Sequence, residues 1–118
     1  MECLRDIGED ALIDRLTAGL PLDAATLVGP GADCAVLATA DAGVRELLKT
    51  DCLVEGVHFA PDTDPEAVGW KALCRSLSDI AAMGGQPRAA LITLAVPADR
   101  AVHVVEGWYR GLRRAAAA

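Results

Sequence analysis

Residues 64–97 decide the fold, and their sequence is DPEAVGWKALCRSLSDIAAMGGQPRAALITLAVP. Asp64 suits a helix N-cap and Pro65 a first helical residue, so the apolar spacing that follows predicts a helix over Pro65–Met83. Two glycines and then Pro87 end that helix. The next segment, Ala90–Val96, is apolar on both faces, which predicts a strand at the centre of a sheet, covered on both sides.

Hydrophobic periodicity predicts further elements outside this stretch. We expect a helix over Ile7–Leu20 and strands over Cys34–Thr39 and Arg45–Val54. A last helix is expected from about Asp99, with one side formed by Ala101, Val105, Trp108 and Leu112. Three helices can cover one face of the sheet as a single layer, and a second copy of the chain can cover the other. The pattern therefore predicts a homodimer.

Length and charge exclude several classes of protein. The 118 residues are enough for one domain with a modest core. Lys and Arg number 11 and Asp and Glu number 17, so the net charge of −6 argues against binding to nucleic-acid phosphates. No apolar run approaches the roughly 20 residues of a membrane-spanning helix, and the N-terminus lacks the layout of a signal peptide. The sequence predicts a cytoplasmic protein that binds neither nucleic acid nor membrane.

Three aspartates in locally apolar stretches are candidates for metal binding. Asp33 follows a Gly-Pro-Gly-Ala turn, Asp51 lies in a predicted strand, and Asp79 lies late in the helix over Pro65–Met83. Carboxylates that converge from a turn, a strand and a helix suit magnesium, which usually also binds substrate phosphates. The alternative is that Asp33 makes an Asx turn, Asp51 pairs with Lys49, and Asp79 is solvated. The spacing alone leaves both interpretations open.

Other polar residues give weaker signals. Gly29 and Gly31 could let backbone amides approach a phosphate, although two glycines around a proline are more often a simple turn. His58, on a loop, is a candidate contact for phosphate or substrate, or an ordinary surface histidine. Lys71 and Arg75, one helical turn apart, are expected to face water rather than phosphate.

Three segments together resemble a known family. They are VGPGADCAVL at 28–37, KTDCLVEGVHF at 49–59 and GWKALCRSLSDIAAMGGQPRAAL at 69–91. In this order the chain resembles the N-terminal domain of thiamine-monophosphate kinases, which belong to the aminoimidazole-ribonucleotide synthetase-related superfamily. The resemblance runs from Gly8 to Pro97. The resemblance implies an α+β fold, a two-layer sandwich of a mostly antiparallel sheet with helices on one face and the other face available for dimerisation.

The resemblance also implies an activity and its residues. The family transfers the γ-phosphate of ATP to thiamine monophosphate, giving thiamine diphosphate and ADP. Carried over by position, Asp33, Thr50, Asp51 and Asp79 bind Mg²⁺, and His58 binds the substrate. Phosphoryl transfer of this kind needs alignment and charge neutralisation more than covalent chemistry by the protein, and Mg²⁺ supplies both. We expect direct in-line transfer without a phosphoenzyme.

The chain departs from the family pattern at two positions and in its extent. Ala32 stands where the family usually has a first aspartate before Asp33, and Lys49 stands where it has Ser or Thr. A cation at Lys49 replaces part of one Mg²⁺ charge or pairs with Asp51. In addition, the chain stops before a Gly-Gly-Asp-Thr segment and the C-terminal domain of the family. We therefore interpret residues 1–118 as a single N-terminal ATP- and metal-binding domain, inactive in isolation.

Two alternative functions follow from the same residues. One is another ATP-using member of the superfamily, of the selenophosphate synthetase or aminoimidazole-ribonucleotide synthetase type. The other is a non-catalytic module that dimerises or binds phosphate, which Ala32, Lys49 and the missing segment favour. The LVEGVHF and LSDIAAMG segments favour the thiamine kinases.

Overall fold

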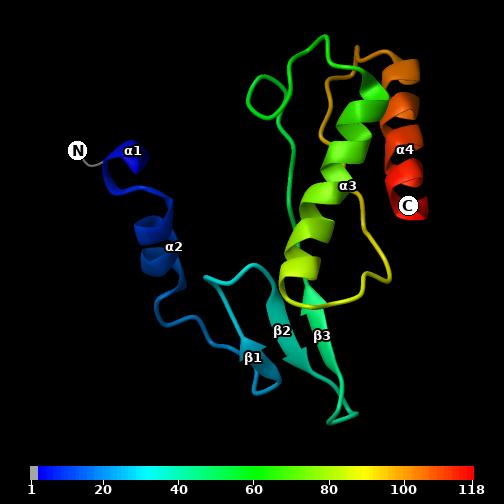
Figure 1. Cartoon of the computed structure of the whole chain (residues 1–118). Coiled ribbons are helices and arrows are strands. Elements are labelled where there is room, and N and C mark those ends of the chain that lie inside the picture. The colour runs from blue at the N-terminus through cyan, green and yellow to red at the C-terminus, as the bar shows by residue number, and fades with distance from the viewer. Residues whose placement is uncertain (1–2) are drawn as a thin grey trace. The chain divides into compact units, whose positions relative to one another are not determined.

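A computed structural model of the chain describes residues 3–118 (Figure 1). It contains two compact units, Met1–Lys49 and Thr50–Ala118. The first unit holds the sheet and two short helices, and the second holds two long helices and the loops that join them. Each unit is described separately below.

The first unit is an antiparallel sheet preceded by helices. Its elements are α1 (Leu4–Ile7), α2 (Glu9–Thr17), β1 (Thr26–Val28), β2 (Ala35–Ala38) and β3 (Arg45–Leu48). The strand order is β1-β2-β3, and both pairings are antiparallel. Together with the helices, this sheet confirms the predicted α+β class.

The predicted helix over Ile7–Leu20 is wrong in its bounds. Gly8 separates α1 from α2 because its φ of 77° is a left-handed conformation that cannot continue a right-handed helix. The second helix then ends at Thr17, and Gly19 has φ 76°. The spacing of leucines identified the helix but not the break inside it.

The predicted strands agree with the sheet in part. The strand predicted over Cys34–Thr39 is confirmed as β2. The strand predicted over Arg45–Val54 is wrong beyond Leu48, where the paired register of β3 with β2 stops. The remaining residues form a loop because no neighbouring strand pairs with them in the described chain.

The second unit contains α3 (Pro65–Ala82) and α4 (Val102–Ala117). As predicted, the Asp64 side chain caps α3 by accepting a hydrogen bond from the Ala67 N–H at 3.0 Å. At the other end, the Gly84 N–H donates to the carbonyl of Ala81 at 2.9 Å, and Gly84 has φ 69°. Within residues 3–118, neither these helices nor any other is long and apolar enough to cross a membrane.

The helices α3 and α4 lie side by side (Figure 1) and approach each other at glycines. A Cβ atom added to Gly69 would lie 1.9 Å from the Trp108 carbonyl oxygen, and one added to Gly111 would lie 2.0 Å from the Glu66 carbonyl oxygen. Gly107 similarly meets the Pro65 ring. The buried residues of α4 are therefore small ones, namely Gly107, Gly111 and Ala115. Of the predicted side, Val105, Trp108 and Leu112 lie in α4 and are half-buried, whereas Ala101 precedes the helix and is exposed.

Ion pairs also connect α3 and α4. Glu66 on α3 accepts hydrogen bonds from Arg110 at 2.8 Å and from Arg114 at 3.1 Å, both on α4. The hydrogen bonds from Arg110 and then Arg114 lower the pKa of the Glu66 carboxyl, so it stays ionised. The Arg114 guanidinium also lies 5.8 Å from the centre of the Trp70 ring, within the range of a cation–π contact.

The predicted central strand over Ala90–Val96 is not a strand here. Residues 89–96 are exposed and have no paired neighbour within residues 3–118. Leu91 is fully exposed, at 100%, and Ile92, Leu94 and Val96 are each more than 40% exposed. A strand needs a backbone partner, and the described chain supplies none for this segment.

The glycine contact predicts an unusual mutational result. We expect Gly111→Ala to lower the free energy of unfolding of the full-length gene product by about 1–3 kcal/mol, because the new methyl group overlaps the α3 backbone. Helix propensity alone predicts the opposite, a stabilisation of up to about 1 kcal/mol. Urea denaturation measures the difference.

A control variant with room for the methyl group is Gly43→Ala. The new Cβ would be 3.4 Å from the Asp41 side chain, an ordinary contact, so we expect a change below about 0.5 kcal/mol. A Gly111→Ala protein as stable as the parent, or more stable, contradicts the close approach of α3 and α4.

Candidate functional site

Four of the five predicted site residues lie in the second unit, on the segment 50–58 and on α3. Thr50, Asp51 and His58 belong to the segment, and Asp79 belongs to the last turns of the helix. Asp33 belongs to the first unit, where it is exposed on the turn between β1 and β2. The contacts of the second unit show how its predicted residues are held.

His58 is positioned by a tight turn of backbone. Its N–H donates to the Val54 carbonyl at 2.8 Å, and the Gly56 N–H donates to the Phe59 carbonyl at 2.8 Å. The His58 Nδ1 atom accepts a hydrogen bond from the Val54 N–H at 3.0 Å. The neutral ring therefore carries its proton on Nε2, which is the nitrogen that can donate to a ligand.

Both carboxylate oxygens of Asp51 accept hydrogen bonds. Oδ1 accepts from the Cys52 N–H at 2.7 Å, and Oδ2 accepts from Arg75 Nε at 2.9 Å. The Asp51 side chain is only 18% exposed. Its orientation is thus set by the neighbouring backbone and by a cation on α3.

Lys71 is exposed and Arg75 is half-exposed, as expected, but both also contact the segment 51–58. Lys71 Nζ donates to the carbonyl oxygen of His58 at 2.5 Å, while Arg75 binds Asp51. With Asp79, these residues recur every four positions along α3, so they share one side of the helix. That spacing was visible in the sequence, but the segment that faces this side was not.

A third cation fixes the middle of the segment. Arg100, just before α4, donates from Nη2 to the Glu55 carboxylate at 2.7 Å. The segment 51–58 is therefore attached at three points, to Lys71, Arg75 and Arg100. Sequence analysis identified neither Glu55 nor Arg100 as part of this attachment.

The donor set of the predicted metal residues fits Mg²⁺ in its chemistry. Asp33, Asp51 and Asp79 offer carboxylate oxygens and Thr50 offers a hydroxyl, which are the hard ligands that Mg²⁺ prefers. No group of three or more His, Cys, Asp or Glu side chains is close enough to hold a metal within residues 3–118. The assignment of these four residues to Mg²⁺ stays a prediction.

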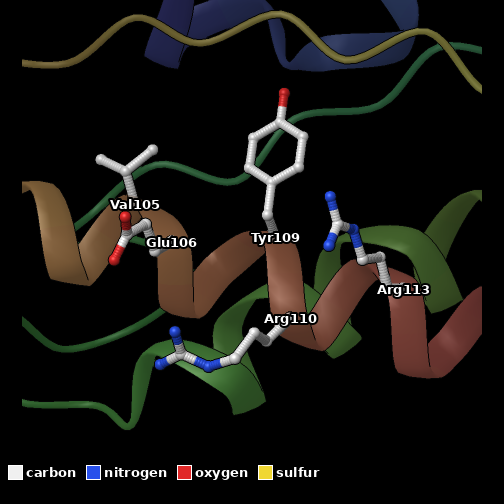
Figure 2. A pocket seen from close by; sticks show the side chains of 5 residues that line it. All are labelled: Val105, Glu106, Tyr109, Arg110 and Arg113. Carbon is white, nitrogen blue, oxygen red and sulfur yellow. The ribbon is translucent and has the colours of Figure 1, made fainter.

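A surface hollow of about 440 Å³ lies elsewhere, along α4. It is lined by Val105, Glu106, Tyr109, Arg110 and Arg113. Figure 2 shows Tyr109 standing away from the helix with Arg113 beside it. None of the predicted site residues lines this hollow, so it is separate from the segment 51–58.

Comparison with known families and structures agrees with this arrangement of elements. A family described as "AIR synthase related protein, N-terminal domain" matches residues 31–118. Among solved structures, the crystal structure of thiamine monophosphate kinase from Aquifex aeolicus is similar, with a TM-score of 0.72 and 36% sequence identity. The match covers 98% of this chain and 35% of that one.

Several curated relatives carry the same name. A thiamine-monophosphate kinase from Synechococcus elongatus is 39% identical over 112 residues, covering 94% of this chain and 32% of the relative. One from Bacillus subtilis is 44% identical over 90 residues, covering 75% of this chain and 27% of the relative. The chain thus spans about a third of the length of the relatives that it matches.

Proposed function

The chain belongs to the family of AIR synthase related protein N-terminal domains, and on this premise we propose that it forms part of a thiamine-phosphate kinase. The reaction passes the terminal phosphoryl group of ATP to the phosphate of thiamine monophosphate, giving thiamine diphosphate and ADP. In this proposal the chain is the N-terminal ATP- and metal-binding domain, and the rest of the enzyme supplies further groups. A cytoplasmic location is part of the proposal, because ATP is made and used there.

One observation carries this proposal. The likeness to the Aquifex kinase extends over nearly the whole chain, at an identity well above the level at which only folds agree. Family membership alone also admits other ATP-using reactions of AIR synthase relatives. The names of the relatives from three organisms favour the thiamine kinase among them.

We assign Asp33, Thr50, Asp51 and Asp79 to the Mg²⁺ site. Their oxygen donors suit the ion, and Asp51 is already oriented by the Cys52 N–H and by Arg75. When bound, Mg²⁺ supplies charge neutralisation and a template for two phosphate groups that would otherwise repel each other. The role of the protein is to hold its own oxygens in place for that ion.

We assign His58 to the binding of thiamine monophosphate. The Val54 N–H fixes its ring, and Lys71 holds its carbonyl, so the Nε2–H can be presented in one direction. A preoriented donor loses little conformational freedom when an acceptor such as a phosphate oxygen binds. Transfer then proceeds directly from donor to acceptor, without a phosphorylated side chain.

We propose a homodimer as the assembled form. The exposed side chains of Leu91, Ile92, Leu94 and Val96 make an apolar row on a segment that has no strand partner within residues 3–118. Such a row favours pairing with another chain.

We expect sedimentation analysis of the full-length gene product to give twice the chain mass, and Ile92→Lys to shift it toward the monomer. A parent protein that sediments as a monomer at micromolar concentration overturns this assignment.

The activity is tested with ATP, thiamine monophosphate and Mg²⁺ on the full-length gene product. We expect the parent to form thiamine diphosphate and Asp51→Asn to lose about 100-fold or more of the turnover, because the neutral amide is a poor ligand for Mg²⁺. Asp62→Asn is the matched control, since Asp62 is an exposed loop acid outside the proposed site, and we expect it to retain parental turnover.

Two results would contradict parts of the proposal. Near-normal turnover by Asp51→Asn would show that this carboxylate does not hold the ion. No thiamine diphosphate from a folded parent would reject the kinase activity, and substrates of the selenophosphate and aminoimidazole-ribonucleotide synthetase types would then be tried.

A further inference from the structure

The ion pair between Arg75 and Asp51 places a cation on the carboxylate that the proposed function gives to Mg²⁺. Arg75 Nε lies 2.9 Å from Asp51 Oδ2, and the two side chains are 39% and 18% exposed. The second oxygen, Oδ1, is held by the Cys52 N–H at 2.7 Å. The carboxylate is thus oriented and neutralised by this chain's own groups.

We propose that Arg75 acts as an internal counter-ion that holds Asp51 in place before metal binding and then opposes the metal, so that Arg75 sets the Mg²⁺ affinity of the site. This inference rests on the proposed function, because it takes Asp51 as a metal ligand. It makes Arg75 a positioning residue, which acts through Asp51 and does not itself touch the substrate.

The repulsion between Arg75 and a bound Mg²⁺ follows from their charges and their distance. Mg²⁺ binds carboxylate oxygens at about 2.1 Å and demands near-octahedral geometry. A guanidinium 2.9 Å from the same carboxylate therefore places two cations within a few ångströms of each other. Because the Asp51 side chain is mostly shielded from solvent, water screens their repulsion less than at an open surface.

The Arg75 side chain is exposed enough to move away from Asp51. Its side chain is 39% exposed, so the guanidinium can turn into solvent when the ion arrives. The segment 51–58 stays attached meanwhile, because Lys71 still holds the His58 carbonyl and Arg100 still holds Glu55. Release of this ion pair thus removes the Arg75 cation from the carboxylate without releasing the whole segment.

The chain offers a matched control for this proposal. Arg110 makes the same kind of ion pair, from Nε to a Glu66 carboxylate oxygen at 2.8 Å, and its partner is neither in the segment 51–58 nor a proposed ligand. Arg110→Gln therefore removes a cation and a hydrogen bond of similar geometry. It leaves the Arg75–Asp51 contact in place.

The test is Mg²⁺ binding without nucleotide, measured by calorimetry on the full-length gene product. We expect Arg75→Gln to bind Mg²⁺ about two- to fivefold more tightly than the parent, as expected for the removal of one competing ion pair. Arg110→Gln and Arg75→Lys, which keeps the charge, should remain close to the parent. Without metal, Arg75→Gln should also speed amide exchange at Cys52, since Asp51 loses a partner.

Unchanged or weaker Mg²⁺ binding by Arg75→Gln overturns the proposal, as does equal tightening in Arg110→Gln. Failure of the inference is distinguishable from failure of the proposed function. If the parent makes thiamine diphosphate and its Mg²⁺ binding is lost in Asp51→Asn, only the role of Arg75 is rejected. If neither holds, the metal assignment itself is wrong and the inference falls with it.

Discussion

The close approach of α3 and α4 is the constraint on which the unit Thr50–Ala118 depends. Gly69 and Gly111 let the backbone of one helix touch that of the other, and any side chain at these positions would overlap a carbonyl. The same approach brings Glu66 within hydrogen-bond distance of Arg110 and Arg114. Few large side chains are fully buried in the described part of this unit, so backbone contact and charge pairing join the two helices together with half-buried apolar side chains.

With one side of α3 fixed against α4, another side is available to organise the segment 51–58. Lys71 and Arg75 reach the His58 carbonyl and the Asp51 carboxylate from that side, and Asp79 follows one turn later. The helix thus places a predicted metal ligand of its own beside two cations that hold the predicted ligands of the segment. Preorganisation of this kind reduces the ordering cost when charged ligands bind.

Local signals in the sequence were sufficient for the elements that cap or pair within the chain. Asp64, the spacing of α3 and the glycines after it gave a helix whose end was wrong by one residue, from Met83 to Ala82. The position of the segment Ala90–Val96 could not be predicted. Its apolar residues indicate that another element covers it, but they do not identify that element. A strand at this position depends on a partner that the described chain does not supply.

The candidate site, like the fold, could be predicted from the sequence only in part. The candidate ligands were predicted from their segments and stay a prediction, but the contacts of Lys71 and Arg75 were missed because helical spacing gives the side of a residue and not what lies opposite. The glycine contact had one visible signal, the four-residue spacing of Gly107 and Gly111 on a predicted helix. Only the structure shows that this spacing meets the backbone of α3.

The central claim is that the segment 51–58 and the side of α3 that faces it form the site for metal and substrate. Hydrogen–deuterium exchange of the full-length gene product, with and without Mg²⁺ and thiamine monophosphate, tests it most directly. The account predicts slower exchange in peptides that cover residues 50–58 and 76–83, with no change in peptides that cover the hollow on α4. Unchanged exchange in both segments, or protection confined to the hollow around Tyr109, would contradict it.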